Sequence, residues 1–574
     1  MMTNAENATI KEMQHQISSL LEQVKLLTEQ NQMLRQRLFG RKSEKKINFY
    51  PDEQLNLMDM IDCSLMFNEA EAVGTPAVPE PQLEEITYKR RKKKGKREMD
   101  FGVLPTQQII HELSERERIC PNCKGELHAC GHDVLRRELT VIPAQYMVTE
   151  HVQTVYSCRD CEKSEKPENS DIPVPMIKAD VPAPVISGSG IASPSLIAYI
   201  ANQKYTLALP LYRQEQEFSR NNLNLSRQTM ANWLIYVSQY WLVPIYNSLR
   251  NILLLAYVLH ADETSVQVLK EDGKPAESKS YIWLYRTGCD AEYPGRMVGQ
   301  AGYRPEQFPK GTTGDAKPPP GPIVLYDYQP DRKHINAKSF LDGFSGYLHS
   351  DGYQAYNNLP STITVVGCWA HLRRKFADIL KSIPDYNKQG SLAMRGVLYC
   401  DKLFELEREY AKLPDDDNFK ERYEARLEKS KPIIDEFFTW AESVYGKHIM
   451  ATPKSNMGKA LAYAMNQRTQ LENVLCDGRL ELSNNRAERS IKPFVIGRKN
   501  WLFSNTEKGA DASALFYSII ETAKENGLKP YEYLKYIFET APNLNLVRNP
   551  NAVETLLPWN APDYCLLIAA ENNE

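Results

Sequence analysis

Three acidic residues are placed where they could meet at one metal site. The apolar run 252–259 predicts a buried strand that ends just before Asp262. A second short apolar strand precedes Asp351, and Glu488 lies in a stretch, 482–492, that favours a short helix. Two divalent cations about 4 Å apart can stabilise both the attacking and the leaving oxygen at phosphorus. We therefore expect metal-assisted phosphoryl transfer at these carboxylates, with two Mg²⁺ ions bound.

Other residues bear on this assignment. Asp327 also ends a predicted strand, so it is an alternative member of the acidic set. His371 follows the last predicted strand and either holds a phosphate, positions a water or is a structural histidine. The chain has 73 Asp and Glu residues, so three acids alone are a weak signal. The amide and basic side chains expected to contact DNA near them are Arg374, Asn485, Arg489, Lys492, Arg498 and Lys499.

A second metal site is indicated by cysteine spacing. Two Cys-x-x-Cys pairs are separated by 34 residues: Cys120 with Cys123, and Cys158 with Cys161. Four thiolates at tetrahedral positions hold one structural Zn²⁺. The eleven cysteines are an odd number, which favours a reducing compartment and metal ligation over disulfides. Free buried thiols are the alternative, and two nearby residues could replace a ligand: Cys130 and His132.

The acids need a scaffold, and the surrounding pattern predicts a sheet. Three further strands are expected at 281–285, 323–327 and 362–367, and one helix is expected at 334–344. The element order is three strands, a helix, a strand, a helix and a strand, which is the order of the ribonuclease-H fold. Residues 385–475 have a charged, helical pattern, so they predict a helical insertion between Asp351 and Glu488. The fold class is therefore multidomain α/β.

The N-terminal residues carry a heptad repeat. Between 8 and 39, one seven-residue spacing holds Ile10, Ile17, Val24, Asn31 and Leu38, and the position three residues later holds Met13, Leu20, Leu27 and Leu34. This pattern favours a parallel two-stranded coiled coil, and a buried Asn such as Asn31 fixes its register. We expect a homodimer or higher oligomer through 8–39. A solitary amphipathic helix is the alternative.

Two further segments could meet DNA. Residues 89–97 hold eight basic residues in nine, which would neutralise phosphates or form a solvated linker. Helices are expected at 194–203 and 211–220, and Ser226 is a good N-cap for a third. This is the helix-turn-helix layout, so Arg227 and Gln228 at the start of the third helix are expected to contact DNA.

Composition narrows the class of protein. The 574 residues, 42% hydrophobic and 25% charged, are enough for several globular domains. The net charge of −3 argues neither for nor against nucleic acid. No stretch approaches the roughly 20 apolar residues that span a bilayer, and no signal-peptide pattern begins the chain. We expect a cytoplasmic protein with no membrane partner.

Eight further motifs follow one another along the chain: 38–44 (LFGRKSE), 209–215 (LPLYRQE), 260–264 (HADET), 350–353 (SDGY), 368–371 (CWAH), 484–489 (NNRAER), 497–503 (GRKNWLF) and 556–560 (LLPWN). With the cysteine pairs, they make the sequence closely similar to bacterial transposases of the insertion sequence 66 family. That family belongs to the class with an Asp-Asp-Glu catalytic triad. The resemblance covers nearly the whole chain.

The resemblance implies a function and a set of roles. Asp262, Asp351 and Glu488 would form the metal-binding triad of a ribonuclease-H-like core. The enzyme would cut double-stranded DNA at the terminal inverted repeats of its element and join the exposed 3′-hydroxyl to target DNA. The N-terminal regions would recognise the ends, in a dimer or larger assembly that works in the bacterial nucleoid with small accessory proteins of the same element.

The predicted domains follow from these segments. They are a coiled-coil helix at 1–45, a flexible basic linker at 46–105, a zinc module at 106–180, a helix-turn-helix-like region at 190–250, the first part of the catalytic core at 251–384, the helical insertion at 385–475, the second part of the core at 476–540 and a C-terminal segment at 541–574. Two other functions stay open: a ribonuclease-H-like nuclease that cuts without joining, and an inactive zinc-dependent DNA-binding regulator.

Overall fold

The computed structural model describes residues 145–157, 176–188, 190–288, 321–384, 388–413 and 418–567. The chain divides into two compact units, and the described part of the larger one runs from 182 to 567. Three predictions fall outside the described residues: the coiled coil at 8–39, the linker at 46–105 and the cysteine ligands of the zinc module.

The described part of the smaller unit contains two short strands. β1 (Val155–Ser157) and β2 (Met176–Lys178) pair in the antiparallel sense. Beside them, the Gln153 side-chain amide donates to the Ala179 carbonyl at 2.7 Å.

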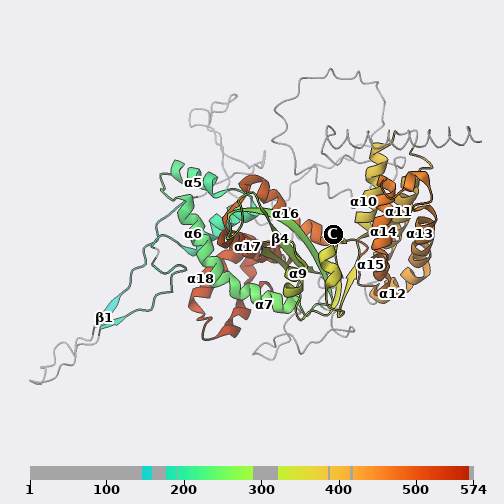
Figure 1. Ribbon diagram of the computed structural model, residues 1–574. Helices are drawn as coiled ribbons and strands as arrows, with labels where there is room; N and C mark the ends of the chain where they lie inside the picture. Colours follow the sequence, from blue (N-terminus) through green and yellow to red (C-terminus); the bar gives the residue numbers. More distant parts are fainter. Residues whose placement is uncertain are drawn as a thin grey trace, which may run out of the picture. The chain divides into compact units, whose positions relative to one another are not determined.

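A mixed sheet forms the centre of the larger unit (Figure 1). Its strands are β3 (Val258–Lys270), β4 (Lys279–Thr287), β5 (Val324–Gln329), β6 (Gly346–His349), β7 (Ile363–Val366) and β8 (Ser504–Thr506). The order is β5-β4-β3-β6-β7, and β8 pairs with the far end of β3. Pairing is antiparallel from β3 through β4 to β5 and parallel from β3 through β6 to β7.

The prediction of a strand at 252–259 that ends before Asp262 is wrong. Ile252 and Leu253 end helix α7 (Val243–Leu253), where they continue its buried face. β3 begins at Val258 and continues past Asp262, because β4 pairs with it across both positions. A short apolar run does not by itself separate a buried helix end from a strand.

The two helices predicted between the later strands differ in the structure. Helix α9 (His334–Phe340) precedes β6, although it is shorter than the predicted 334–344. The helix expected between β6 and β7 is only a 3-10 turn, η7 (Gln354–Asn358). β6 and β7 are adjacent and only four residues long, so a short crossover joins them.

Helices cover both faces of the sheet and one edge. On one face, Tyr326 of β5 packs against Phe494 of α16 (Asn485–Trp501). On the other, Tyr285 of β4 stacks on Phe340 of α9 at 3.8 Å. α17 (Glu507–Glu525) lies along the β5 edge, where its Ser518 and Thr522 hydroxyls bond the backbone of Tyr326 and Val324. The edge backbone groups are thereby satisfied.

Helices precede the sheet where the sequence predicts them. They are α4 (Pro194–Ala201), the π-helical turn η3 (Asn202–Thr206), α5 (Leu211–Arg220), α6 (Arg227–Val237), the π-helical turn η4 (Ser238–Leu242) and α7. The Ser226 hydroxyl accepts from the Thr229 amide at 3.1 Å and caps α6, as predicted. The α5–turn–α6 arrangement is therefore present, and its contact with DNA stays a prediction.

The predicted insertion is helical throughout its described part, and its helices form one bundle (Figure 1). α10 (Trp369–Ser382) leads into α11 (Leu392–Tyr410), α12 (Asn418–Ala425), η9 (Arg426–Ser430), α13 (Lys431–Val444), η10 (Ile449–Ala451), α14 (Asn456–Asn466), α15 (Arg468–Glu472) and η11 (Asn473–Cys476). The buried Arg426 pairs with Glu407 and donates to the Leu480 carbonyl at 2.7 Å. The bundle thereby holds the segment that returns to the sheet.

The described chain ends in α18 (Pro530–Thr540) and the short turns η12 (Ala541–Asn543), η13 (Pro550–Leu556), η14 (Pro558–Asn560) and η15 (Asp563–Cys565). In the described ranges, none of the helices combines the length and the hydropathy needed to span a bilayer.

Candidate functional site

Strand register places Asp262 beside Asp351. β3 and β6 run parallel, and His260 lies opposite His349. Each acid follows its histidine by two residues, so both acids lie just beyond the last β3–β6 pair, at the same level. Residues two apart on a strand point to the same face. Asp262, which lies within β3, is therefore on the face that carries both histidines, and Asp351 follows the end of the neighbouring β6.

The same alternation shows which helix covers that face. Asp262 pairs with Leu284, which pairs with Tyr326. The Tyr326 ring lies 6.5 Å from Phe494 of α16, and its hydroxyl donates to the Ser490 carbonyl. α16, which carries Glu488 in its first turn, thus packs over the face of Asp262.

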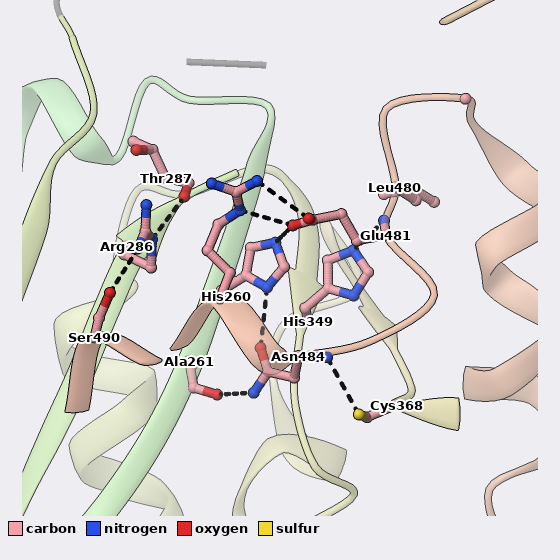
Figure 2. A network of polar contacts seen from close by, with 12 residues as sticks. His260, Ala261, Arg286, Thr287, His349, Cys368, Leu480, Glu481, Asn484 and Ser490 are labelled. Carbon is pink, nitrogen blue, oxygen red and sulfur yellow. Dashed lines mark hydrogen bonds and ion pairs between the residues drawn. The ribbon is translucent and has the colours of Figure 1, made fainter. Parts of the chain in front are cut away.

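Asn484, just before α16, ties the start of this helix to the sheet (Figure 2). Its side-chain Nδ2 donates to the Ala261 carbonyl at 2.7 Å, and its Oδ1 lies 3.0 Å from Nδ1 of His260. Its backbone N–H points to Sγ of Cys368 at 3.2 Å. Asn484 is fully buried. β3, the start of α10 and the segment before α16 therefore meet at this one residue, directly before the helix that carries Glu488.

The Glu481 carboxylate extends these contacts from His260 (Figure 2). His260 Nε2 lies 2.8 Å from Oε2 of Glu481, and Arg486 donates to both oxygens of the same carboxylate. The His260 and His349 rings stack with centroids 4.3 Å apart, and His349 Nε2 accepts from the Glu481 amide. We use the name docking network for five residues of these two sets of contacts: His260, His349, Cys368, Glu481 and Asn484.

The hydrogen bonds of the docking network determine which ring nitrogen of His260 carries a hydrogen. The Ala261 carbonyl can only accept, so the Asn484 amide must present its NH₂ there and its oxygen to His260. Nδ1 of His260 therefore carries a hydrogen, while its Nε2 faces the Glu481 carboxylate. Burial lowers the pKa of His260, which Glu481 opposes. Burial would raise the pKa of Glu481, but His260 and Arg486 bring it well below its usual value.

The three acids influence one another electrostatically. The pKa of Asp262 is raised well above its usual value, first by burial and then by the negative charges of Glu263, Asp351 and Glu488. Such a set of crowded carboxylates gains stability when a cation enters. Oxygen donors of this kind suit Mg²⁺, so the residues fit the predicted metal.

Two basic side chains of α10 already contact the third acid. His371 Nδ1 lies 3.5 Å from Glu488 Oε1, and Arg374 donates to Oε2 of Glu488 at 3.2 Å. Burial lowers the pKa of His371, and the charge of Glu488 opposes this shift. His371 therefore lies at the acidic site, as the sequence led us to expect, while its contact with a phosphate stays a prediction.

In the described part of the chain, Cys368, His371 and Glu488 bring one ligand atom each to within 4.8 Å of one another. Burial raises the pKa of the Cys368 thiol to about 11, and its sulfur already faces the Asn484 amide. A neutral thiol is a poor metal ligand. We therefore assign Cys368 to the docking network.

The loop after β6 holds Asp351 in place. The Tyr353 amide donates to Asp351 Oδ1 at 3.0 Å, and the Tyr463 hydroxyl donates to the Asp351 carbonyl at 2.8 Å. Gly352, which lies between Asp351 and Tyr353, has φ +85°. A Cβ at this position would lie 3.1 Å from the hydroxyl oxygen of Tyr463. A glycine is needed at this position both for its backbone angle and for space.

The alternative acid Asp327 lies elsewhere. It pairs with Trp283, which pairs with Glu263, so it shares the face of Glu263 and not that of Asp262. Burial raises its pKa to about 6, and the charges that act on it are those of Asp511 and Arg250. The structure therefore separates Asp327 from the three predicted acids.

The residues predicted to contact DNA lie on three helices, with His371 and Arg374 on α10 and the rest on α6 and α16. Arg227 and Gln228 open α6, where Arg227 lies over the Tyr212 ring and Gln228 bonds Asn232. Those on α16 are Asn485, Arg489, Lys492, Arg498 and Lys499. Arg489, Lys492 and Lys499 are exposed, whereas Arg498 is half-buried and donates to the Thr264 hydroxyl at 3.2 Å.

Sequence reasoning missed the docking network. One signal was present: His260-Ala-Asp262 and His349-Ser-Asp351 share a His-x-Asp spacing. Two parallel strands with this spacing bring both histidines opposite each other. Glu481 and Asn484 had no such signal, because their partners lie more than two hundred residues away or across the insertion.

Four models of known protein families match parts of the chain. The model described as "Transposase IS66 family" matches residues 189–512, more than half of the chain. The "zinc-finger binding domain of transposase IS66" matches 117–162, which includes both cysteine pairs. The "IS66 C-terminal element" matches 518–559, and "Transposase C of IS166 homeodomain" matches 26–105.

Two relatives come from Sinorhizobium fredii. Uncharacterized protein y4qI is 30% identical over 469 residues, which are 80% of this chain and 77% of that protein. Uncharacterized protein y4hP is 27% identical over 548 residues, which are 92% of this chain and 87% of that protein. The matched domains, together with the mixed sheet and its acids, are those of a DNA-binding transposase that processes DNA with divalent metal and zinc. The chain belongs to the IS66 family of transposases.

Proposed function

We propose that this transposase binds the terminal inverted repeats of its own insertion sequence and catalyses Mg²⁺-dependent strand cleavage and strand transfer. The observation that carries this proposal is the convergence of Asp262, Asp351 and Glu488. The charges of the last two raise the pKa of the first, although long stretches of sequence separate all three.

The sheet supports the proposed ribonuclease-H-like core. Three antiparallel strands continue into two parallel ones, in the order β5-β4-β3-β6-β7. The first acid lies on the central strand and the second just after its parallel neighbour. The third arrives from a helix after a long insertion, which accounts for the interrupted core that we propose for 251–384 and 476–540.

Three carboxylates would hold the two Mg²⁺ ions: Asp262, Asp351 and Glu488. The bound ions would activate the attacking oxygen and stabilise the leaving one. The chain's own residues prepare this site. Asp351 is oriented by the Tyr353 amide, and Glu488 is oriented by the anchored start of α16. Arg374 and His371, which contact Glu488, are placed to meet an incoming phosphate.

DNA binding would use several parts of the molecule. α16 carries five basic residues and one acid, so its outer face favours a phosphate backbone. Arg227 and Gln228 begin α6, where a helix start can enter a groove. We further propose that one Zn²⁺ is held by the two cysteine pairs, that residues 8–39 form the oligomer contact, and that the enzyme acts in the cytoplasm with accessory proteins of its element.

The test uses full-length protein and duplexes that carry the terminal repeats flanking its gene. Intact duplexes report cleavage, and duplexes with a pre-cut 3′-hydroxyl report joining to a target plasmid. We expect both products with Mg²⁺ and neither with a chelator. Asp262→Asn should keep DNA binding and lose both products.

A matched control is Asp342→Asn, an exposed acid outside the site. It should cut and join as the wild type does. Cleavage without joining of pre-cut ends would identify a nuclease. DNA binding with no Mg²⁺-dependent product would identify a regulator, and wild-type rates from Asp262→Asn would remove that residue from the mechanism.

A further inference from the structure

The catalytic helix α16 ends in a tight turn that exposes two apolar side chains. Leu502 is 63% exposed and Phe503 is 43% exposed. The Phe503 amide donates to the Trp501 carbonyl at 2.8 Å, so the chain turns about Leu502 alone. We name these two residues the apolar tip. Neither side chain contributes to the buried core.

The backbone at the apolar tip is strained. Leu502 has φ +65° and ψ −50°, a region that L residues with bulky side chains rarely adopt. Glycine would take this conformation without a steric penalty, yet leucine occupies it. Strained positions persist where the surroundings enforce them, and they gather at functional sites.

The surroundings hold the turn from both sides. Trp501 packs edge-on against Phe494 at 5.4 Å, and β8 after the turn pairs with Val268 and Lys270 of β3. Asn500 donates to the Ala208 carbonyl at 3.1 Å, and Ala208 itself has φ +55°. The apolar tip is therefore a fixed feature of this unit.

The surface that leads to the tip is basic. Between Glu488 and the end of α16, Arg489, Lys492 and Lys499 are exposed. DNA that follows this helix from the acidic site would keep its phosphates near these cations. Exposed apolar side chains at the end of such a path would meet bases rather than phosphates.

Two elements give similar distances from the acids to the region of the tip. Leu502, which directly follows α16, is 14 residues after Glu488, which is about 21 Å at 1.5 Å per residue. Asp262 and Val268, the partner of Ser504, are six residues apart on β3, which is about 20 Å. At about 3.4 Å per base step, both correspond to roughly six base pairs.

We propose that Leu502 and Phe503 form an apolar wedge that contacts and unstacks bases of the bound duplex about six base pairs from the cleaved phosphate. This inference rests on the proposed function, because it needs DNA at the acidic site. Apolar side chains that insert between base steps unstack them, and aromatic rings stack on the exposed base faces.

The binding test places 2-aminopurine at successive positions of a terminal-repeat duplex, with no divalent metal present, so that the DNA stays intact. Fluorescence rises when this base loses its stacking neighbours. With the wild type we expect a rise centred about six positions from the cleavage site. Leu502→Gly and Phe503→Ser should each remove most of it, whereas Val547→Ser, a change at a 93% exposed valine of the C-terminal segment, should not.

Two variants of Leu502 distinguish the effect of losing its side chain from the effect of relieving its backbone strain. Leu502→Ala and Leu502→Gly both remove the side chain, but only glycine relieves the backbone strain. We expect both variants to lose the rise in 2-aminopurine fluorescence to the same extent, and the glycine variant to have the higher Tm. A purely structural role would instead make the signal follow Tm.

Cleavage then tests the consequence for catalysis. On fully paired DNA, Phe503→Ser should cut roughly tenfold more slowly than the wild type. On DNA with two mismatched base pairs at the same position, the difference should fall below about twofold, because the bases are already unpaired. Variants that cut paired DNA like the wild type and leave the fluorescence unchanged would overturn the wedge. A fluorescence rise without any cleavage by the wild type would overturn the proposed function and leave the wedge standing.

Discussion

Asp262 has a raised pKa because it is buried and because Glu263, Asp351 and Glu488 surround it with negative charge. Without a cation, part of this charge is balanced by Arg374, which contacts Glu488 from α10 beside His371. In the proposed site, a metal ion and Arg374 would therefore compete for the Glu488 carboxylate.

Arg374→Ala tests this competition. Loss of the guanidinium beside Glu488 should strengthen binding of Mn²⁺, in the absence of DNA, by roughly threefold. The same variant should bind DNA more weakly, with a salt slope smaller by about one. Titration calorimetry and salt-dependent DNA binding measure the two effects. Lys381→Ala, on the same helix but paired with Asp378, should change neither, and weaker Mn²⁺ binding by Arg374→Ala would contradict the competition.

Asp327→Asn tests the rejected alternative acid. Burial raises the pKa of Asp327 in the folded protein to about 6. In the unfolded chain this carboxyl has its ordinary pKa of about 4, so it ionises at a lower pH there than in the folded protein. The wild type should therefore lose stability between about pH 4 and 6, by at most about 3 kcal/mol. Asparagine removes this loss. Urea unfolding should show equal stability near pH 4 and a more stable variant at pH 8.

The same variant should cut DNA normally, because Asp327 faces the other side of the sheet. Loss of cleavage by Asp327→Asn with normal cleavage by Asp351→Asn would mean that the triad is misassigned.

At the scale of elements, the start of α16 is fixed by the docking network. Asn484 bonds His260 and Ala261 of β3 and faces Cys368 at the start of α10. Glu488 lies one helical turn further on. The position of the third acid therefore depends on hydrogen bonds to a strand that carries the first.

Asn484→Ala should loosen this attachment. Two buried partners, His260 Nδ1 and the Ala261 carbonyl, would lose their hydrogen bonds, which costs roughly 2–4 kcal/mol. Cleavage should then need several-fold more Mg²⁺ for half its maximal rate, and high Mg²⁺ should restore much of that rate. Asn466→Ala, an exposed asparagine of α14, is the control. A stability loss with unchanged Mg²⁺ dependence would show that Asn484 does not position Glu488.

The sequence predicted these elements unevenly. β4 to β7, the helical insertion and the start of α6 at Ser226 were confirmed, because each has a clear apolar period or cap. The strand before Asp262 was misplaced, because Ile252 and Leu253 fit a helix end equally well. The docking network could not be predicted from local pattern, since Glu481 and Asn484 acquire partners only when the chain returns from the insertion.

At the scale of the whole molecule, the zinc-finger match at 117–162 includes both cysteine pairs. We predict one Zn²⁺ per chain, held by Cys120, Cys123, Cys158 and Cys161. Metal analysis of purified protein should find no zinc in Cys123→Ser or Cys161→Ser. Cys130→Ser should keep the full amount. Zinc lost from Cys130→Ser and kept in Cys161→Ser would show that the ligand set is wrong.

The insertion separates Asp262 and Asp351 from Glu488 in the sequence. Arg426 within it bonds the Leu480 carbonyl, just before Glu481 of the docking network. The bundle therefore returns the chain to the sheet at a defined place. Assembly of the acidic site depends on both halves of the core and on the helices between them.

Metal binding by single-acid variants shows whether Asp262, Asp351 and Glu488 share one metal site. Mn²⁺ affinity would be measured by calorimetry for the wild type, Asp262→Asn, Asp351→Asn, Glu488→Gln and the control Asp342→Asn. If the three acids share one site, each of the first three changes should weaken binding by at least roughly tenfold, and the control should match the wild type. Wild-type affinity in Glu488→Gln would contradict the shared site.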